Sequence, residues 1–411
     1  MHRLLVVSEL YYPEETSTGY FLTGIAEGIQ ARGDFEVRAL SVEPTYSKRG
    51  ETALKDEVRA GVHIHRLSAP IGNKNKLLGR LWNMLSLTFR MGFALGFAIK
   101  RNDYVLVVTN PPSLPLLVGW IARLKGAHPV LLMHDVYPDV LVPTGFTTEK
   151  SLIYRGIDRL QQHMLRLMSG IVVLGRDMKK RVARKCPHVH ANFSIIPNWG
   201  DVEQITPNGR SQNPVRAQHG LEGKFIVQFS GNLGRTHGLE DVVETAKRLL
   251  ENQRICFLIF GWGAGRDWLE DQIHKHQLDN VLLLPPCHKD ELGDYLNACD
   301  LFFMPFKDAM EGISVPSRMY NVMAAGNAFL AVTSDQSELA KVVKEERIGY
   351  VVAPKDLKGM QRCIEQALND PERLAEMRLR SRKAALHQYT QAHVVNAYNN
   401  LFNDLAQQPK S

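Results

Sequence analysis

The chain has 411 residues, more than the roughly 250–300 that one hydrophobic core usually supports, so two domains are expected. Hydrophobic residues make up 44% and charged residues 23%, a balance that excludes a disordered or fibrous chain. The formal net charge of +7 fits a phosphorylated small molecule, an anionic membrane surface or nucleic acid as partner, and equally a basic surface with no partner.

The five cysteines form no C-x-x-C pair and are odd in number, which argues against a disulfide framework and a structural zinc site. We therefore expect a reducing, cytoplasmic location. The apolar run Leu4–Val7 is too short for a signal peptide, and no stretch of 18 apolar residues predicts a transmembrane helix.

The first half of the chain alternates short apolar runs with segments of helical periodicity, which indicates an α/β domain with a parallel sheet. Gly33 is the expected C-cap of its first helix. The predicted strands are Leu4–Ser8, Val37–Val42, Val105–Val108, Pro129–His134 and Gly170–Leu174, and the predicted helices are Tyr20–Arg32, Leu114–Leu124, Ser151–Ser169 and Arg176–Lys185.

A polar stretch, Asp201–Gly220, reads as a linker, and a second α/β series follows it. Ligands of such open sheets bind beyond the carboxyl ends of the strands, so the loops after strands are the candidate sites. The strands predicted in this half are Phe225–Ser230, Ile255–Phe260, Val281–Leu284, Leu301–Met304 and Phe329–Val332, and the last predicted helix is Ala392–Leu405.

The loop after the strand Phe225–Ser230 is rich in glycine and opens a helix. Gly231, Asn232 and Gly234 would let the backbone approach a phosphate, and Arg235 would add a charged contact. The alternative is that the glycines only permit a tight turn. Trp262, in the loop after the next strand, is a further candidate contact to the same ligand.

A second candidate anion site follows the strand Leu301–Met304. It consists of Ser314, Val315, Pro316, Ser317 and Arg318, which open a helix. The two serines are candidate caps, and a diphosphate would sit on the exposed amides with the arginine as counter-charge. The alternative is an ordinary capped helix with a salt-bridged arginine.

His134 and Asp135 stand at the end of the strand Pro129–His134. A histidine in this place can contact a substrate hydroxyl or transfer a proton. The alternative is a hydrogen-bonded structural histidine.

Two cationic surfaces predict contact with anionic lipid headgroups. Lys76–Lys100 is an apolar helix with a narrow basic stripe of Lys76, Arg80, Asn83 and Arg90, and Arg176–Lys185 carries six basic residues against one Asp. The alternatives are a core helix with a solvated stripe and an ordinary charged helix. No nucleic-acid-binding motif accompanies the charge, so no nucleic acid is expected as partner.

Six motifs in order resemble those of glycosyltransferase family 4, and more narrowly its bacterial branch in capsule, O-antigen and colanic-acid-type exopolysaccharide synthesis. They are Tyr11–Glu14 with Gly19, Thr109–Ser113, Asp135–Asp139, Ile196–Trp199, Ser230–Glu240 and Ser314–Gly326. The resemblance covers essentially the whole chain.

The resemblance implies a GT-B fold, with two Rossmann-like domains facing across a cleft and a final helix returning to the first domain. We expect residues 1–199 plus 390–411 to hold the acceptor and residues 200–389 to hold the nucleotide sugar. The implied reaction is a retaining transfer to an acceptor hydroxyl, in which cations and amides, without a metal or cofactor, stabilise the leaving diphosphate.

Site residues follow from the same motifs. The expected catalytic residues are His134, Asp135, Arg235 and Arg318, the expected acceptor contacts are Gly19, Asn110, Pro111 and Tyr137, and the expected donor contacts are Gly231, Asn232, Gly234, Arg235, Trp262, Ser314, Val315, Pro316, Ser317, Arg318 and Asn321.

The chain departs from the family pattern at several positions. Ile313 and Asn321 stand where many members carry two glutamates, and an asparagine supplies hydrogen bonds but no negative charge. Asn232 and His237 replace the common Arg and Lys of the phosphate loop, and Arg318 stands where this branch often has Lys. These changes bear on donor identity.

The leading interpretation is a hexosyl- or N-acetylhexosaminyltransferase that uses a nucleotide sugar, with UDP favoured. Its acceptor would be a lipid-linked or glycan intermediate, and the protein would lie peripherally on the inner face of the cytoplasmic membrane. Two alternatives stay open: a UDP-sugar epimerase on the same fold, and a non-catalytic binding subunit of a polysaccharide assembly, which the altered glutamate pattern favours.

Overall fold

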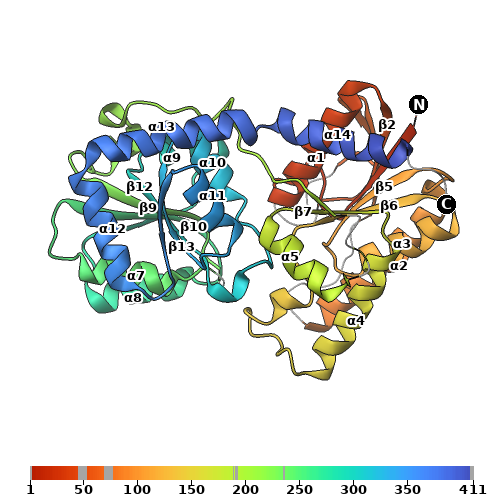
Figure 1. The fold of residues 1–411 in the computed structure, drawn as a ribbon, viewed down its shortest axis with the longest axis horizontal. Coiled ribbons are helices and arrows are strands. Elements are labelled where there is room, and N and C mark those ends of the chain that lie inside the picture. The colour runs from red at the N-terminus through yellow and green to blue at the C-terminus, as the bar shows by residue number, and fades with distance from the viewer. Residues whose placement is uncertain are drawn as a thin grey trace. The chain divides into compact units, whose positions relative to one another are not determined.

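The computed structural model describes residues 2–44, 53–68, 77–187, 189, 193–234 and 237–407, without the side chains of 77–85 and 211. The chain divides into two compact units, which are described one at a time (Figure 1). Unit 1 consists of Met1–Val142, Thr147–Asn198 and Gln391–Ser411, and unit 2 consists of Pro143–Phe146 and Trp199–Thr390.

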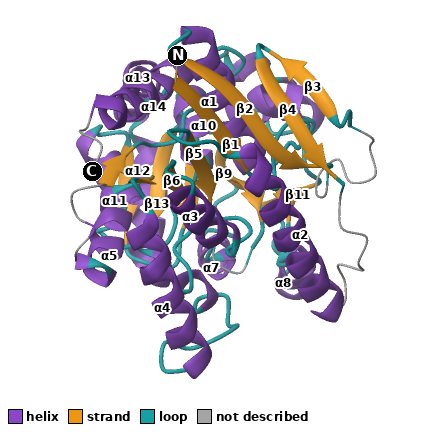
Figure 2. Ribbon diagram, turned by 90° about the vertical axis from the view of Figure 1, so that its right-hand side faces the viewer, coloured by secondary structure: helices purple, strands orange, loops and turns teal. Residues whose placement is uncertain are grey.

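The described part of unit 1 has an eight-stranded sheet in the order β3-β4-β2-β1-β5-β6-β7-β8. Neighbouring strands run parallel except β3 and β4, which form an antiparallel edge (Figure 2). The strands are β1 (His2–Val7), β2 (Phe35–Val42), β3 (Asp56–Arg59), β4 (Val62–Leu67), β5 (Tyr104–Val108), β6 (His128–Met133), β7 (Gly170–Val173) and β8 (Phe193–Ile195).

Helices cover both faces of this sheet, and Figure 1 shows α1 and α14 on the opposite side from α2, α3 and α4. The described helices are α1 (Ser17–Arg32), α2 (Leu77–Ala98), α3 (Leu114–Leu124), α4 (Leu152–Leu167), α5 (Arg176–Lys185) and α14 (Gln391–Gln407). The predicted cap of α1 is confirmed, since Gly33 has a φ of 80° and its N–H donates to the Gln30 carbonyl.

The C-terminal helix α14 packs on α1, so the chain returns to unit 1 as predicted. A Cβ on Gly28 of α1 would lie 2.4 Å from Cγ2 of Val395, which shows how closely the two helices approach. The Asn399 side chain donates to the Asp34 carboxylate at 2.8 Å, and the Phe402 ring packs 5.8 Å from the Phe35 ring.

The sheet of unit 2 is parallel, with the order β11-β10-β9-β12-β13-β14. Its strands are β9 (Phe225–Asn232), β10 (Ile255–Trp262), β11 (Val281–Leu284), β12 (Leu301–Pro305), β13 (Ala328–Val332) and β14 (Gly349–Val352). Its helices are α6 (Pro214–Gln218), α7 (Leu239–Arg248), α8 (Arg266–His276), α9 (Leu292–Asn297), α10 (Arg318–Ala324), α11 (Glu338–Glu345), α12 (Leu357–Asn369) and α13 (Pro371–Gln388).

The predicted linker Asp201–Gly220 contains the short helix α6 and packs within unit 2. Asn213 caps the short helix α6 by accepting from the Val215 and Arg216 N–H groups. Arg216 is buried and donates to the Asp300 carboxylate at 2.5 Å. The polar residues that suggested a flexible segment serve here as caps and as a buried ion pair.

Strands also occur where the sequence did not predict them, at β3, β4 and β14. β9 and β10 each run two residues further than expected, through Asn232 and Trp262. The extension depends on glycine, because a Cβ on Gly261 would lie 1.9 Å from the Gly231 carbonyl oxygen. Gly261 also has a φ of 143°, which L side chains rarely adopt.

Candidate functional site

Three of the predicted motifs meet at the carboxyl edge of the unit 1 sheet. They follow β1, β5 and β6, which are neighbours in the sheet. Each motif contains a cis peptide bond: Tyr12–Pro13, Asn110–Pro111 and Tyr137–Pro138. The structure therefore brings Asn110, Pro111 and Tyr137 to the same edge as His134.

Gly19 lies in the first turn of α1, beside the loop that follows β1. A Cβ at this position would lie 2.6 Å from the Glu14 carbonyl oxygen, so the close approach of the loop requires glycine. The Gly19 N–H donates to the Thr16 hydroxyl, which caps the helix. The glycine thus shapes the loop at this edge.

His134 is held from two directions by residues that the sequence did not single out. Its Nδ1 lies 3.1 Å from the Thr18 hydroxyl of α1, and its backbone N–H donates to the Thr109 hydroxyl at 3.3 Å. The other ring nitrogen, Nε2, is covered and has no hydrogen-bond partner. Burial lowers the pKa of His134 to about 4, so the ring is neutral at pH 7.

Asp135 shares this support, since its N–H also donates to the Thr109 hydroxyl, at 3.4 Å. Burial raises the pKa of its carboxyl to about 6. The pair therefore has an inverted order, in which the carboxyl releases its proton at a higher pH than the imidazolium. As whole residues, His134 and Asp135 are half-buried at the sheet edge.

Asp139, the last residue of the Tyr-Pro-Asp motif, anchors this loop to the basic helix α5. Its buried carboxylate pairs with Arg181, at 2.8 Å, and with Lys185, which also reaches Asp158 at 2.7 Å. Two of the six cations of α5 are therefore committed to holding the loop.

In unit 2, Arg318 lies against the end of β9. Its Nη1 donates to the Ser230 carbonyl at 2.5 Å, and its guanidinium lies 5.2 Å from the centre of the Phe229 ring. A Cβ on Gly231 would lie only 3.2 Å from Nη1, so the glycine makes room for the arginine. Burial lowers the pKa of Arg318 to about 10, which leaves it charged at pH 7.

The rest of the predicted phosphate loop is braced by the loop after β10. The Leu233 N–H donates to the Trp262 carbonyl at 2.7 Å, and the Gly265 N–H donates to the Leu233 carbonyl at 2.8 Å. A Cβ on Gly263 would meet Oδ1 of Asn232 at 2.6 Å. The Trp262 side chain is 66% exposed, and Arg235 lies outside the described residues.

His237, which follows this loop, is kept neutral. Burial first, and the charge of Arg318 second, lower its pKa to about 3. A Cβ on Gly234 would lie 3.2 Å from its Nδ1, so the ring lies under the glycine loop. Within the part of this loop that the structure describes, the charged guanidinium of Arg318 thus lies beside the neutral imidazole of His237.

The segment Ser314–Ser317 precedes the seven-residue helix α10. Val315 is buried, and the Ser317 side chain makes no capping hydrogen bond, so its predicted role as a side-chain cap is wrong. Oδ1 of Asn321 accepts from the Asp201 N–H at 3.0 Å. This side chain therefore fastens the segment that enters unit 2. Asn321 lies one turn after Arg318 in α10, and its predicted donor contact stays a prediction.

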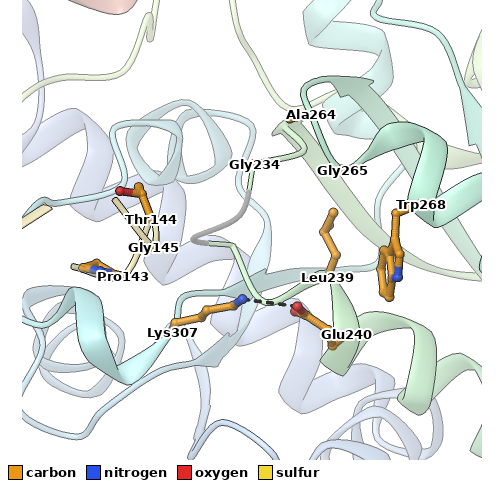
Figure 3. A pocket seen from close by; sticks show the side chains of 10 residues that line it. All are labelled: Pro143, Thr144, Gly145, Gly234, Leu239, Glu240, Ala264, Gly265, Trp268 and Lys307. Atoms are coloured by element: carbon orange, nitrogen blue, oxygen red, sulfur yellow. Dashed lines mark hydrogen bonds and ion pairs between the residues drawn. The ribbon is translucent and has the colours of Figure 1, made fainter. Parts of the chain in front are cut away.

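A hollow of about 400 Å³ opens beside Gly234 in unit 2 (Figure 3). In Figure 3, Trp268 and Leu239 form an apolar side, and Lys307 faces Glu240 with an ion pair of 3.2 Å. Its remaining lining residues are Pro143, Thr144, Gly145, Ala264 and Gly265. Among the described residues, Gly234 is the single predicted donor residue that lines this hollow. Lys307 could have been found from its place just after β12.

Family models match both halves of the chain. "Glycosyl transferase 4-like domain" matches residues 18–199, and "Glycosyl transferases group 1" matches residues 211–385. The chain is 31% identical to "Probable glycosyltransferase WbjE" of Pseudomonas aeruginosa over 89% of both chains. The chain belongs to glycosyltransferase family 4.

Other relatives agree with this assignment. The chain is 25% identical to "Putative colanic acid biosynthesis glycosyl transferase WcaI" of Escherichia coli (strain K12), over 90% of this chain and 93% of the relative. Among solved structures, Anabaena Alr3699/HepE in complex with UDP-glucose matches with a TM-score of 0.72 at 13% identity, over 99% of this chain and 100% of that one. WaaG, a glycosyltransferase involved in lipopolysaccharide biosynthesis, matches with a TM-score of 0.66 at 15% identity, over 97% of this chain and 99% of that one.

The predicted GT-B fold of two Rossmann-like halves is confirmed by these matches and by the two parallel sheets. The described residues contain no group of three or more His, Cys, Asp or Glu side chains that could hold a metal ion. None of the described helices combines the length and apolar content needed to cross a membrane.

Proposed function

We propose that this glycosyltransferase moves a hexosyl or N-acetylhexosaminyl group from a UDP-linked donor to an acceptor hydroxyl, with retention of configuration. The acceptor is a lipid-linked or glycan intermediate of cell-surface polysaccharide synthesis. The relative named for colanic acid biosynthesis supports this acceptor class, and the neighbour solved with UDP-glucose supports the donor.

The placement of Arg318 carries the donor half of the proposal. A charged guanidinium stands beside a glycine at the carboxyl end of a central strand, where ligands of open α/β sheets bind. Arginine matches phosphate oxygens with two parallel N–H donors. Arg318 and nearby backbone N–H groups would hold the diphosphate, and no metal is assigned to this role.

In the proposed reaction, the bond between the anomeric carbon and the diphosphate oxygen breaks, and its electron pair stays on the diphosphate. The acceptor oxygen forms the new bond to the anomeric carbon. The acceptor hydroxyl proton passes to the leaving diphosphate oxygen, which balances the step. Arg318 stabilises the negative charge that develops there, and neutral His134 contributes to the acceptor edge of unit 1.

A thermal-shift screen against UDP, GDP, ADP and dTDP tests the donor site. A ligand at 100 times its dissociation constant raises the apparent stability by about 2.7 kcal/mol. We expect UDP to give the largest shift and Arg318→Ala to reduce it. Arg248→Ala, on the exposed surface of α7, is the matched control and should keep the full shift.

The same assay separates the alternatives. No shift with any of the four nucleotides would favour a non-catalytic subunit. Conversion of a UDP-sugar to its epimer without any acceptor would favour an epimerase and overturn the transfer proposal.

A further inference from the structure

We infer that the outer surface of helices α2, α3 and α4 docks on an anionic lipid bilayer. This inference rests on the proposed function only in that a lipid-linked acceptor would lie in that bilayer. We call this surface the α2–α4 face and define it by the exposed residues Phe89, Phe93, Phe97, Trp120, Leu124 and Leu160. Figures 1 and 2 both show the three helices as neighbours on one side of the unit 1 sheet.

Helix α2 presents a row of three phenylalanines to solvent. Phe89, Phe93 and Phe97 stand four residues apart on one side of the helix and are 79%, 68% and 74% exposed. The described residues on the opposite side, including Leu87 and Met91, are buried against the unit. Exposing large aromatic rings to water is unfavourable, so such a row marks a surface that binds something.

Helices α3 and α4 extend this row into a broader face. Trp120 and Leu124 of α3 are 48% and 88% exposed, and Leu160 of α4 is 49% exposed. Nε1 of Trp120 donates to Nε2 of His163 in α4 at 3.0 Å, which fixes the indole beside that helix.

A separate contact connects α3 to α2. A Cβ on Gly92 of α2 would lie 3.2 Å from Leu117 of α3, so these two helices touch at a glycine. The apolar side chains therefore belong to one continuous layer of helices.

The charge on these helices identifies the partner. Helix α4 exposes Arg155, Arg159 and Arg166, and its single acidic residue, Asp158, is paired with Lys185. The sequences of α2 and α3 contain no Asp or Glu. Exposed apolar side chains flanked by arginine suit an interfacial helix on anionic lipid, in which the rings enter the headgroup boundary.

A second copy of the chain fits this face less well. A two-fold interface pairs the same patch on both subunits, so the arginines of α4 would approach their own copies without acidic partners. Of the two surfaces that the sequence suggested, the face includes the helix within Lys76–Lys100 and not Arg176–Lys185. In α5, Arg181 and Lys185 are occupied by Asp139, whereas the phenylalanines of α2 supply the apolar contact.

Co-sedimentation with vesicles tests the face. The probes are vesicles of phosphatidylcholine alone and of phosphatidylcholine with phosphatidylglycerol. We expect the wild type to bind only the anionic vesicles, and less at high salt. The variant Phe89→Ser/Phe93→Ser/Phe97→Ser should lose binding at least tenfold, and Arg155→Glu/Arg159→Glu should lose it on anionic vesicles.

The matched control, Arg32→Glu/Lys275→Glu, makes the same charge change on exposed positions of α1 and α8 and should bind as the wild type. Each variant should keep the UDP thermal shift, which separates loss of docking from misfolding or failure of the donor proposal. Equal binding by the phenylalanine variant, no binding of the wild type at low salt, or a dimer in sedimentation that the same variant abolishes would overturn the inference.

Discussion

The two sheets present different chemistry at their carboxyl edges. In unit 1, burial keeps His134 neutral and raises the pKa of Asp135 to about 6, so this described pair places a neutral imidazole beside a carboxylate at the edge and supplies no cation. In unit 2, Arg318 keeps its charge, and His237 beside it is neutral. A hydroxyl can donate to a carboxylate or an imidazole nitrogen, whereas a diphosphate is stabilised by a cation, and the contrast matches these two tasks.

The largest expected loss of stability follows from replacing a glycine at the edge of either sheet. Gly261→Ala should unfold unit 2 or cost at least ~3 kcal/mol, because its Cβ would lie 1.9 Å from a backbone oxygen and its φ is left-handed. Gly19→Ala should cost less, since its Cβ contact is 2.6 Å and its φ is ordinary. Thermal unfolding of both variants would check the order.

A matched control for these variants is Gly156→Ala in helix α4. A Cβ there meets nothing within 4 Å, so the change should stabilise the protein by about 0.5–1 kcal/mol. A Gly261→Ala protein as stable as the wild type would show that the β9–β10 contact does not hold the loop.

The next largest expected effect is the pH dependence of stability that His134 and Asp135 cause in unit 1. The pKa of His134 falls from about 6.5 unfolded to about 4 folded, so its contribution to the unfolding free energy is lost as pH falls from 6.5 to 4. The pKa of Asp135 rises from 3.8 to about 6, so its contribution is lost as pH rises through 6. The two slopes oppose each other in the wild type.

Single variants should separate these slopes. Between pH 6.5 and 4, the unfolding free energy of His134→Gln should rise relative to that of Asp135→Asn, by roughly 3 kcal/mol or more, at about 1.4 kcal/mol per pKa unit. Melting both variants across this range measures the difference, in which contributions shared by the two proteins cancel. Parallel curves would contradict the burial of the pair.

A smaller effect is expected from the residue that orients His134. Thr18 is its hydrogen-bond partner at Nδ1. The hydroxyl can donate to or accept from this nitrogen, so its loss should shift the balance between the two tautomers. Thr18→Val should lower kcat about tenfold with little change in KM for the donor, whereas Thr18→Ser should restore most of the rate. Nitrogen NMR of the imidazole would show the change of tautomer directly.

The sequence predicted most elements because their apolar periodicity is strong and their ends carry clear signals. Helix α3 matches its predicted bounds, and Gly33 caps α1 as expected. The edge strands β3 and β4 were missed because their solvent-facing positions interrupt the apolar pattern. Single-chain patterns also cannot show that Asp201–Gly220 packs through Arg216 and Asp300.

The positions of candidate site residues could be predicted where a motif follows a strand, but not where a contact joins residues distant in the chain, and the roles of these residues stay predictions. His134, Asn110 and Tyr137 reached one edge because β1, β5 and β6 are neighbours. The contact between Thr18 and His134 spans 116 residues, and no local signal indicates it. The sequence likewise did not indicate that the carboxamide oxygen of Asn321 accepts from the Asp201 N–H, 120 residues away in the chain.

Calorimetric titration of UDP into His134→Ala and Arg318→Ala, with the wild type alongside, tests the division between the two edges most directly. The account predicts that Arg318→Ala weakens UDP binding about 10- to 100-fold, the equivalent of ~1.5–3 kcal/mol for a charged hydrogen bond, and that His134→Ala leaves it unchanged. Normal UDP affinity in Arg318→Ala, with a loss in His134→Ala, would contradict the placement of the donor on unit 2.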